Sequence, residues 1–217
     1  NILNIAIYNG GNMQDNNNLQ KEIVSSLYGY IARMKEILPK IYGRQPVACV
    51  NTYGCQQNVS DSERIKGLLC EMGYSITDDD TNADFVLFNT CAVRGHAEDR
   101  VFGNIGRMKL LKKERSNMVV AVCGCMAQQQ IVCDKVKKSY PYVDILFGTR
   151  HIHKLPEFLY KRLTGSGRIF DISEDFNDIL EGLPVRRDGN LKGWLPIMYG
   201  CDNFCTYCIV PHVRGRE

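Results

Sequence analysis

VACVNTYGCQQNVSDSERIKGLLCEMGY, residues 47–74, places a short apolar run directly before an amphipathic stretch. We expect a strand from Val47 to Asn51, because its residues are apolar or β-prone and a glycine follows at position 54. Ser60 and Glu63 have the spacing of a capping box, so the sequence predicts a helix from Ser60 to Met72. This stretch is one strand–helix unit.

The same alternation continues for another 90 residues or so. Strands are predicted at Phe85–Asn89, Met118–Cys123 and Val143–Phe147, and helices at about Glu98–Glu114, Ala127–Lys138 and Lys154–Leu163. Strands that alternate with helices at this interval favour an α/β fold, a parallel sheet with helices on both faces.

Other segments flank this α/β domain, which we place at residues 46–163. Residues 1–45 form an N-terminal extension: a mobile segment up to Asn18, then a helix from Leu19 to Leu38 that Pro39 ends. Residues 164–193 are rich in turn formers and indicate a linker with one strand at 168–172. A second domain begins at Trp194 and is incomplete at Glu217, so we expect these 217 residues not to turn over by themselves.

Composition directs attention to the cysteines. The net charge of +3 is too small to indicate a nucleic-acid partner. No apolar run is long enough to span a membrane and the first residues do not have the pattern of a signal peptide, which favours a cytoplasmic protein without a membrane span. The chain has 10 cysteines. Because disulfides are rare in a reducing compartment, metal ligation or catalysis explains them better.

Three cysteines near the end have the spacing Cys-x3-Cys-x2-Cys, at Cys201, Cys205 and Cys208. Three thiolates on one loop can hold three irons of a 4Fe–4S cluster and leave the fourth iron open to a small molecule. A zinc knuckle completed by His212 is the alternative.

Three more cysteines, Cys55, Cys91 and Cys125, each follow a predicted strand. The carboxyl ends of parallel strands lie at one edge of a sheet, so these thiolates are expected to converge there and to bind a second 4Fe–4S cluster with one open iron. Gly54 and Gly124 would let the backbone bend tightly beside it.

The remaining candidate residues have simpler interpretations. Cys49, Cys70 and Cys133 are interpreted as small buried hydrophobic residues, and Cys123 as packing beneath the cluster. His96, His151 and His153 are expected in solvent, while His212 could line the cofactor site. The basic residues within 107–115 are interpreted as a solvated helix face, with a surface for a nucleic-acid backbone as the alternative.

The string from Gly200 to Glu217, GCDNFCTYCIVPHVRGRE, resembles the radical-SAM signature of the methylthiotransferase family. The strings around Cys55, Cys91 and Cys125 are similar to the N-terminal domain of that family, so the resemblance covers about residues 46–217. It implies the methylthiotransferase N-terminal fold, followed by the start of a radical-SAM α/β barrel. It also implies two 4Fe–4S clusters, S-adenosyl-L-methionine at the cluster of Cys201, Cys205 and Cys208, and an auxiliary cluster at the other three cysteines that carries the inserted sulfur. A tRNA substrate and an electron donor protein are the implied partners.

Three substrate groups share this architecture: isopentenylated adenosine in tRNA, threonylcarbamoyladenosine in tRNA, and an aspartate of a ribosomal protein. Cys55-Gln-Gln-Asn58, followed by Asp61-Ser-Glu63, looks most like the first group, with Gln57 where methionine is usual. The strings Val101–Gly106 and Val143–Gly148 point the same way. The resemblance therefore implies addition of a methylthio group to carbon 2 of N6-isopentenyladenosine at tRNA position 37. A non-catalytic zinc or iron–sulfur module that binds RNA is a further alternative.

Overall fold

The protein folds around a single six-stranded sheet in which every strand is parallel to its neighbours. The computed structural model describes residues 13–92, 95–173, 182–189 and 191–216, with the side chains of 13–17 and 95–99 left aside. Strands follow the order β2-β1-β3-β4-β5-β6. Their bounds are Val47–Tyr53 (β1), Ser75–Thr77 (β2), Phe85–Thr90 (β3), Val119–Gly124 (β4), Ile145–Phe147 (β5) and Ile169–Asp171 (β6). The predicted α/β fold class is confirmed.

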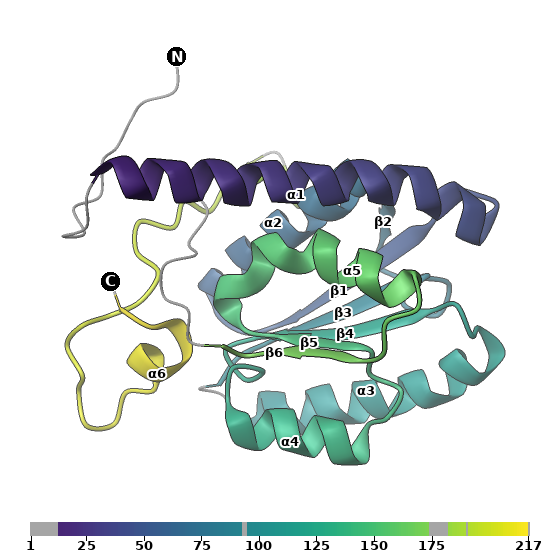
Figure 1. Cartoon of the computed structure of the whole chain (residues 1–217). Helices are drawn as coiled ribbons and strands as arrows, with labels where there is room; N and C mark the ends of the chain where they lie inside the picture. The colour runs from purple at the N-terminus through teal and green to yellow at the C-terminus, as the bar shows by residue number, and fades with distance from the viewer. Residues whose placement is uncertain (1–12, 93–94, 174–181, 190, 217) are drawn as a thin grey trace.

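Helices cover both faces of this sheet, as Figure 1 shows. One face carries α1 (Met13–Tyr42), α2 (Gln56–Met72) and α5 (Leu155–Leu163), and the other carries α3 (Gly95–Glu114) and α4 (Gln130–Ser139). A 3-10 helix, η1 (Thr149–Lys154), precedes α5, and a short α6 (Val210–Arg214) lies beyond the strand ends. Within the described ranges no helix is long and apolar enough to cross a membrane.

Two apolar layers form the core, one on each side of the sheet. All six residues of β3 and of β4 are buried, which is why both segments read as nearly continuous apolar runs. The N-terminal helix contributes four buried side chains to one layer: Leu27, Ile31, Met34 and Leu38. Helix α1 is therefore packed into the same core, while the domain limits at residues 46, 164 and 194 stay predictions.

The start of α2 differs from the sequence expectation. Cys55, not Ser60, is the N-cap, and the oxygen Oδ1 of Asn58 accepts a hydrogen bond of 3.2 Å from the backbone N–H of Cys55. Ser60 and Glu63 lie buried inside the helix. The predicted capping box at Ser60 is wrong, because an earlier pair of residues already satisfies the first turn.

The end of α1 also differs from the prediction, because the helix continues through Pro39 to Tyr42. The backbone N–H of Gly43 donates to the carbonyl of Pro39 at 2.9 Å, and the hydroxyl of Tyr42 donates to the carbonyl of Asn117 at 3.0 Å. These bonds hold the last turn although proline removes one helical donor. Of the segment expected to be mobile, residues 1–12 lie outside the described residues. Residues 13–18 already belong to α1, so the expectation of a mobile segment up to Asn18 is wrong there.

Two further outcomes concern strands. The predicted strand at 168–172 is confirmed as β6, which pairs with β5. Strand β2 was not predicted, because Ser75–Thr77 is only three residues long and carries little apolar pattern.

One buried carboxylate, that of Asp144, joins three elements near the amino ends of the central strands. It accepts hydrogen bonds from the backbone N–H of Val120 and from Nε of Arg162, both at 2.8 Å. The ammonium of Lys112, on α3, forms an ion pair with it as well. Asp144 therefore binds α3, β4 and α5 to one point.

We expect Asp144→Asn to lower the free energy of unfolding by about 3 kcal/mol, since it leaves two partly buried cations without their carboxylate. Urea denaturation of the variant and parent measures the difference. Asp134→Asn, on the exposed side of α4, is the matched control and should change stability by no more than about 0.5 kcal/mol. Equal effects from both variants would contradict the assigned role of Asp144.

Candidate metal centre

The three strand-end cysteines follow three residues that stand side by side in the sheet. Tyr53 of β1 is paired with Thr90 of β3, and Thr90 is paired with Gly124 of β4. Cys91 and Cys125 come one residue after this row, and Cys55 comes two residues after it. The backbone thus brings all three to the carboxyl edge of neighbouring strands.

This edge also includes the point where the strand order reverses. From β1 the chain passes through α2 to β2 on one side, whereas β3 lies on the other side of β1, and α2 and α3 cover opposite faces. Open α/β sheets bind ligands in the crevice outside such a point. Cys55 and Cys91 follow the two strands that flank it.

The two glycines beside the cysteines are required by close approach. Gly124 has φ of +99°, and a Cβ there would lie 2.3 Å from the carbonyl oxygen of Thr90. A Cβ on Gly54 would lie 2.2 Å from Oδ1 of Asn58. A larger residue at position 124 would therefore clash with the backbone of Thr90, and one at position 54 would displace the Asn58 side chain.

Two buried asparagines, Asn58 and Asn89, connect the loops. The Nδ2 group of Asn58 donates to Oδ1 of Asn89 at 3.0 Å, and Nδ2 of Asn89 donates back to the carbonyl of Asn58 at 2.9 Å. Asn89 also donates to the hydroxyl of Ser62 at 2.9 Å. Sequence reasoning did not find this network, although an asparagine inside the apolar strand of Phe85–Thr90 was a signal for it.

The thiols at this edge have different surroundings. Cys91 and Cys125 are buried, whereas Cys55 is half-buried. Burial raises the pKa of the Cys125 thiol, the Arg214 guanidinium lowers it in part, and the nearby Cys91 raises it again. Iron binding there would displace thiol protons, because thiolates are the ligands.

Three thiols at one sheet edge are soft donors of the kind that iron–sulfur clusters take. Among the described residues, no three histidine, cysteine or acidic side chains are gathered so that they could hold one metal ion. In a 4Fe–4S cluster each thiolate binds a different iron, so sulfurs spread over three neighbouring strand ends suit it. That these three cysteines are ligands stays a prediction.

The second set of cysteines lies in the C-terminal loop. Cys205 is exposed, Cys201 and Cys208 are half-buried, and the backbone N–H of Cys208 donates to the carbonyl of Cys205 at 2.9 Å. Among the described residues of this loop, the three cysteines do not form a group that could hold one metal ion. The same holds for the three cysteines together with His212, the set that a zinc knuckle would need. Their role as ligands is likewise a prediction.

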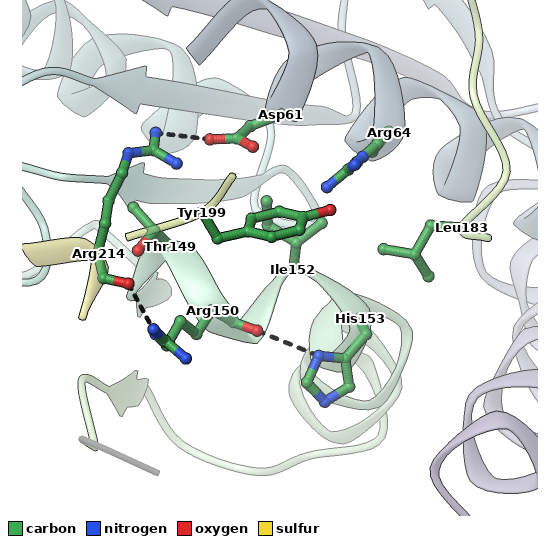
Figure 2. Close-up of a pocket in the computed structure, with 9 residues that line it drawn as sticks. All are labelled: Asp61, Arg64, Thr149, Arg150, Ile152, His153, Leu183, Tyr199 and Arg214. Carbon is green, nitrogen blue, oxygen red and sulfur yellow. Dashed lines mark hydrogen bonds and ion pairs between the residues drawn. The ribbon is translucent and has the colours of Figure 1, made fainter. Parts of the chain in front are cut away.

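A partly open hollow of about 30 Å³ lies between α2, η1 and the C-terminal segment. Figure 2 shows Arg214 directed at Asp61 on one side and Tyr199 near the centre. The guanidinium of Arg64 lies 5.1 Å from the centre of the Tyr199 ring. The hollow is lined by Asp61, Arg64, Thr149, Arg150, Ile152, His153, Leu183, Tyr199 and Arg214.

The histidine expectations need correction. His151 and His153 are buried, not in solvent, because η1 packs between the sheet edge and the C-terminal segment. His151 Nδ1 lies 3.3 Å from a carboxylate oxygen of Asp171, and His153 Nδ1 lies 3.2 Å from the carbonyl of Arg150. His212 is exposed. The side chain of His96 lies outside the described residues.

The remaining cysteines largely behave as expected. Cys49 and Cys133 are buried, and Cys123 is buried within the core layer beneath α1, α2 and α5. Cys70 is only half-buried, so its interpretation as a core residue is wrong. It faces the segment before Asp188, and its sulfur accepts a hydrogen bond of 3.3 Å from Arg186.

The basic residues within 107–115, at the end of α3 and just after it, are used mainly inside the domain. Arg107 pairs with Asp80, Lys112 with Asp144, and Arg115 with Asp84. Only some of this stretch, including Lys109 and Lys113, is exposed. The structure thus gives three of these cations a role in holding the fold.

Comparison with known proteins agrees with this geometry. The family model described as "Uncharacterized protein family UPF0004" matches residues 47–148, which contain all three strand-end cysteines. A tRNA-2-methylthio-N(6)-dimethylallyladenosine synthase of Thermoanaerobacter sp. (strain X514) is 50% identical over 184 residues, which are 85% of this chain and 39% of that protein. The synthase of Clostridium perfringens (strain SM101 / Type A) is 52% identical over 169 residues, 78% of this chain and 38% of that protein.

A third relative of the same name, from Halalkalibacterium halodurans, is 45% identical over 190 residues, 86% of this chain and 35% of that protein. The chain therefore spans less than two fifths of the length of these relatives. It is a methylthiotransferase homologue that contains a UPF0004 domain and corresponds to the N-terminal part of these synthases.

Proposed function

We propose that this chain is the N-terminal part of a tRNA methylthiotransferase that works by radical S-adenosylmethionine chemistry. Its product would be the 2-methylthio derivative of N6-isopentenyladenosine at tRNA position 37. The observation that carries the proposal is the row Tyr53, Thr90 and Gly124, which sets three cysteines at one sheet edge, at the strand-order reversal.

The two sets of cysteines would have separate tasks. Domains of this family usually bind a 4Fe–4S cluster, and the cysteines for one are present in Cys55, Cys91 and Cys125. Cys201, Cys205 and Cys208 would hold a second cluster, at which S-adenosyl-L-methionine binds. When bound, the first cluster would supply the sulfur that is inserted, and the second the electron that cleaves the sulfonium.

The residues around the first set would keep its geometry fixed. Asn58 and Asn89 tie the loop after β1 to the end of β3, and Thr90 donates through its hydroxyl to the carbonyl of Cys123 at 2.7 Å. Because Cys91 and Cys125 are buried, the protein would limit the access of water to that side of the cluster. These contacts are made by the protein's own side chains and would orient the strand ends around a cluster.

The choice of substrate rests on the relatives and on one short string. The relatives' names specify dimethylallyladenosine in tRNA, which is the isopentenylated base. In Cys55-Gln-Gln-Asn58 the asparagine has the structural role described above, and Gln57 contacts Asp61 at 3.4 Å. The departure at Gln57 therefore leaves the cysteines unaffected. A threonylcarbamoyladenosine tRNA enzyme and a ribosomal-protein aspartate enzyme are the competing assignments, and a tRNA and an electron donor protein are the proposed partners.

Metal analysis tests the two cluster sites separately. After anaerobic reconstitution, the protein should hold about eight irons and about eight sulfides per chain. The triple variant Cys55→Ala/Cys91→Ala/Cys125→Ala should retain about four irons, and so should Cys201→Ala/Cys205→Ala/Cys208→Ala. Cys70→Ala, which removes a half-buried thiol near the opposite end of α2 from Cys55, is the control and should retain the full content. One zinc per chain without sulfide would instead support a non-catalytic RNA-binding module.

Analysis of tRNA nucleosides tests the substrate. Deletion of the gene that encodes this chain should abolish 2-methylthio-N6-isopentenyladenosine and leave N6-isopentenyladenosine in its place, as measured by mass spectrometry. The intact gene and its Cys70→Ala variant should restore the modification, whereas Cys91→Ala should not. Loss of the methylthio group from threonylcarbamoyladenosine, or unchanged tRNA, would overturn the proposed substrate.

A further inference from the structure

Arg214 connects the C-terminal segment to the strand-end edge. Its Nε donates to the sulfur of Cys125 at 3.1 Å, and its Nη2 donates to Oδ2 of Asp61 at 2.8 Å. All three side chains are buried, with Arg214 8% exposed. One guanidinium thus contacts a predicted cluster ligand and a carboxylate of α2 at once, as Figure 2 shows for the bond to Asp61.

The backbone around Arg214 is held by η1. The hydroxyl of Thr149 donates to the carbonyl of Val213 at 2.8 Å, and Nε of Arg150 donates to the carbonyl of Arg214 at 2.8 Å. Arg150 also donates through Nη2 to the carbonyl of Arg216 at 3.1 Å. The position of Arg214 is therefore determined by main-chain contacts as well as by its own side chain.

The same segment closes the loop that carries the second set of cysteines. The backbone N–H of Cys201 donates to the carbonyl of Gly215 at 3.1 Å. A Cβ on Gly200 would lie 2.1 Å from that carbonyl oxygen, so only glycine allows this approach. Residues 200–216 are thus one loop whose two ends meet next to Arg214, and fixing Arg214 also fixes Cys201.

The pairing is specific in charge. Asp61 is 2% exposed and would be left as a buried unpaired carboxylate without the guanidinium. The planar guanidinium offers parallel donors to two acceptors, whereas a lysine ammonium at the end of a flexible chain would act as a point charge. An arginine at 214 is therefore suited to bridge a sulfur and a carboxylate.

We propose that Arg214 is a positioning residue that joins the two cysteine sets, holding the loop of Cys201, Cys205 and Cys208 beside the first set while donating a charge-assisted hydrogen bond to the Cys125 sulfur. This inference rests on the proposed function insofar as Cys125 ligates a cluster. A thiolate bound to iron keeps lone pairs that accept hydrogen bonds, so the contact is compatible with ligation. Hydrogen bonds to cluster sulfurs raise the reduction potential.

Hydrogen–deuterium exchange of the metal-free chain tests the joining role. In Arg214→Gln, the amide of Cys201, which donates to the carbonyl of Gly215, should exchange at least about tenfold faster, because the end of the loop is released. The double variant Asp61→Asn/Arg214→Gln leaves no buried carboxylate unpaired, so it should show the same acceleration in a folded domain. Arg216→Ala is the matched control, since the Arg216 side chain is exposed and its guanidinium lies near the Phe204 ring. Unchanged exchange in both Arg214 variants would overturn the proposal.

The reduction potential of the first cluster tests the hydrogen bond to sulfur. In a Cys201→Ala/Cys205→Ala/Cys208→Ala background only the first cluster is loaded. Arg214→Gln should then shift the potential to a more negative value, Arg214→Lys should restore part of the shift, and Arg216→Ala should cause none. An unchanged reduction potential would show that Arg214 holds the loop in place without donating a hydrogen bond to a cluster ligand. That result would also overturn the proposal. Failure of the parent to take up iron would refute the proposed function instead, and hydrogen exchange would still decide whether Arg214 joins the two segments.

Discussion

Parallel pairing of β1, β3 and β4 in one register is the constraint on which the rest of this structure depends. It sets Tyr53, Thr90 and Gly124 in a row, so that the chain leaves all three strands at the same edge. Cysteines 36 and 34 residues apart in the sequence thereby follow neighbouring positions in space. A parallel sheet requires helices between its strands, and those helices make the intervals long.

The buried asparagines hold the carboxyl ends of β1 and β3 in fixed positions relative to each other. Parallel strand ends alone would leave the loops after β1 and β3 free to move, but Asn58 and Asn89 exchange hydrogen bonds across them. Their polar groups lie in a buried setting and would be costly if unpaired. The missing side chains at Gly54 and Gly124 allow the loops to approach, so polar pairing and close packing act together.

Much of this fold could be predicted because a continuous apolar run indicates a strand that is buried on both faces, as β3 and β4 are. The misses have a common physical origin in contacts between distant segments. Nothing local distinguishes the box at Ser60 from the cap that Cys55 forms, and nothing near Pro39 reveals that Asn117 holds the end of α1. His151 looked solvated because its neighbours are polar, yet it is buried against Asp171 of β6 and Ser173.

Helix α2 shows most clearly why local patterns were insufficient at the site. Its apolar side, with Ile65, Leu68 and Leu69, packs into the core as its periodicity predicts. Its charged side is buried as well.

On that charged side Asp61 pairs with Arg214, Glu63 with Arg187, and Lys66 with Asp188, partners more than 120 residues away in the sequence. A Cβ on Gly67 would lie 2.1 Å from the carbonyl oxygen of Pro184, so the linker packs directly on the helix. The helix that begins at Cys55 thus binds the segment leading to Cys201 through ion pairs in which the α2 side chain is buried, whereas Arg187 and Asp188 are themselves exposed. Since a buried charge is tolerated only with its counter-ion, these pairs favour one position for the linker over many. The distance between the two cysteine sets is thereby set largely by α2, not by the length of the linker.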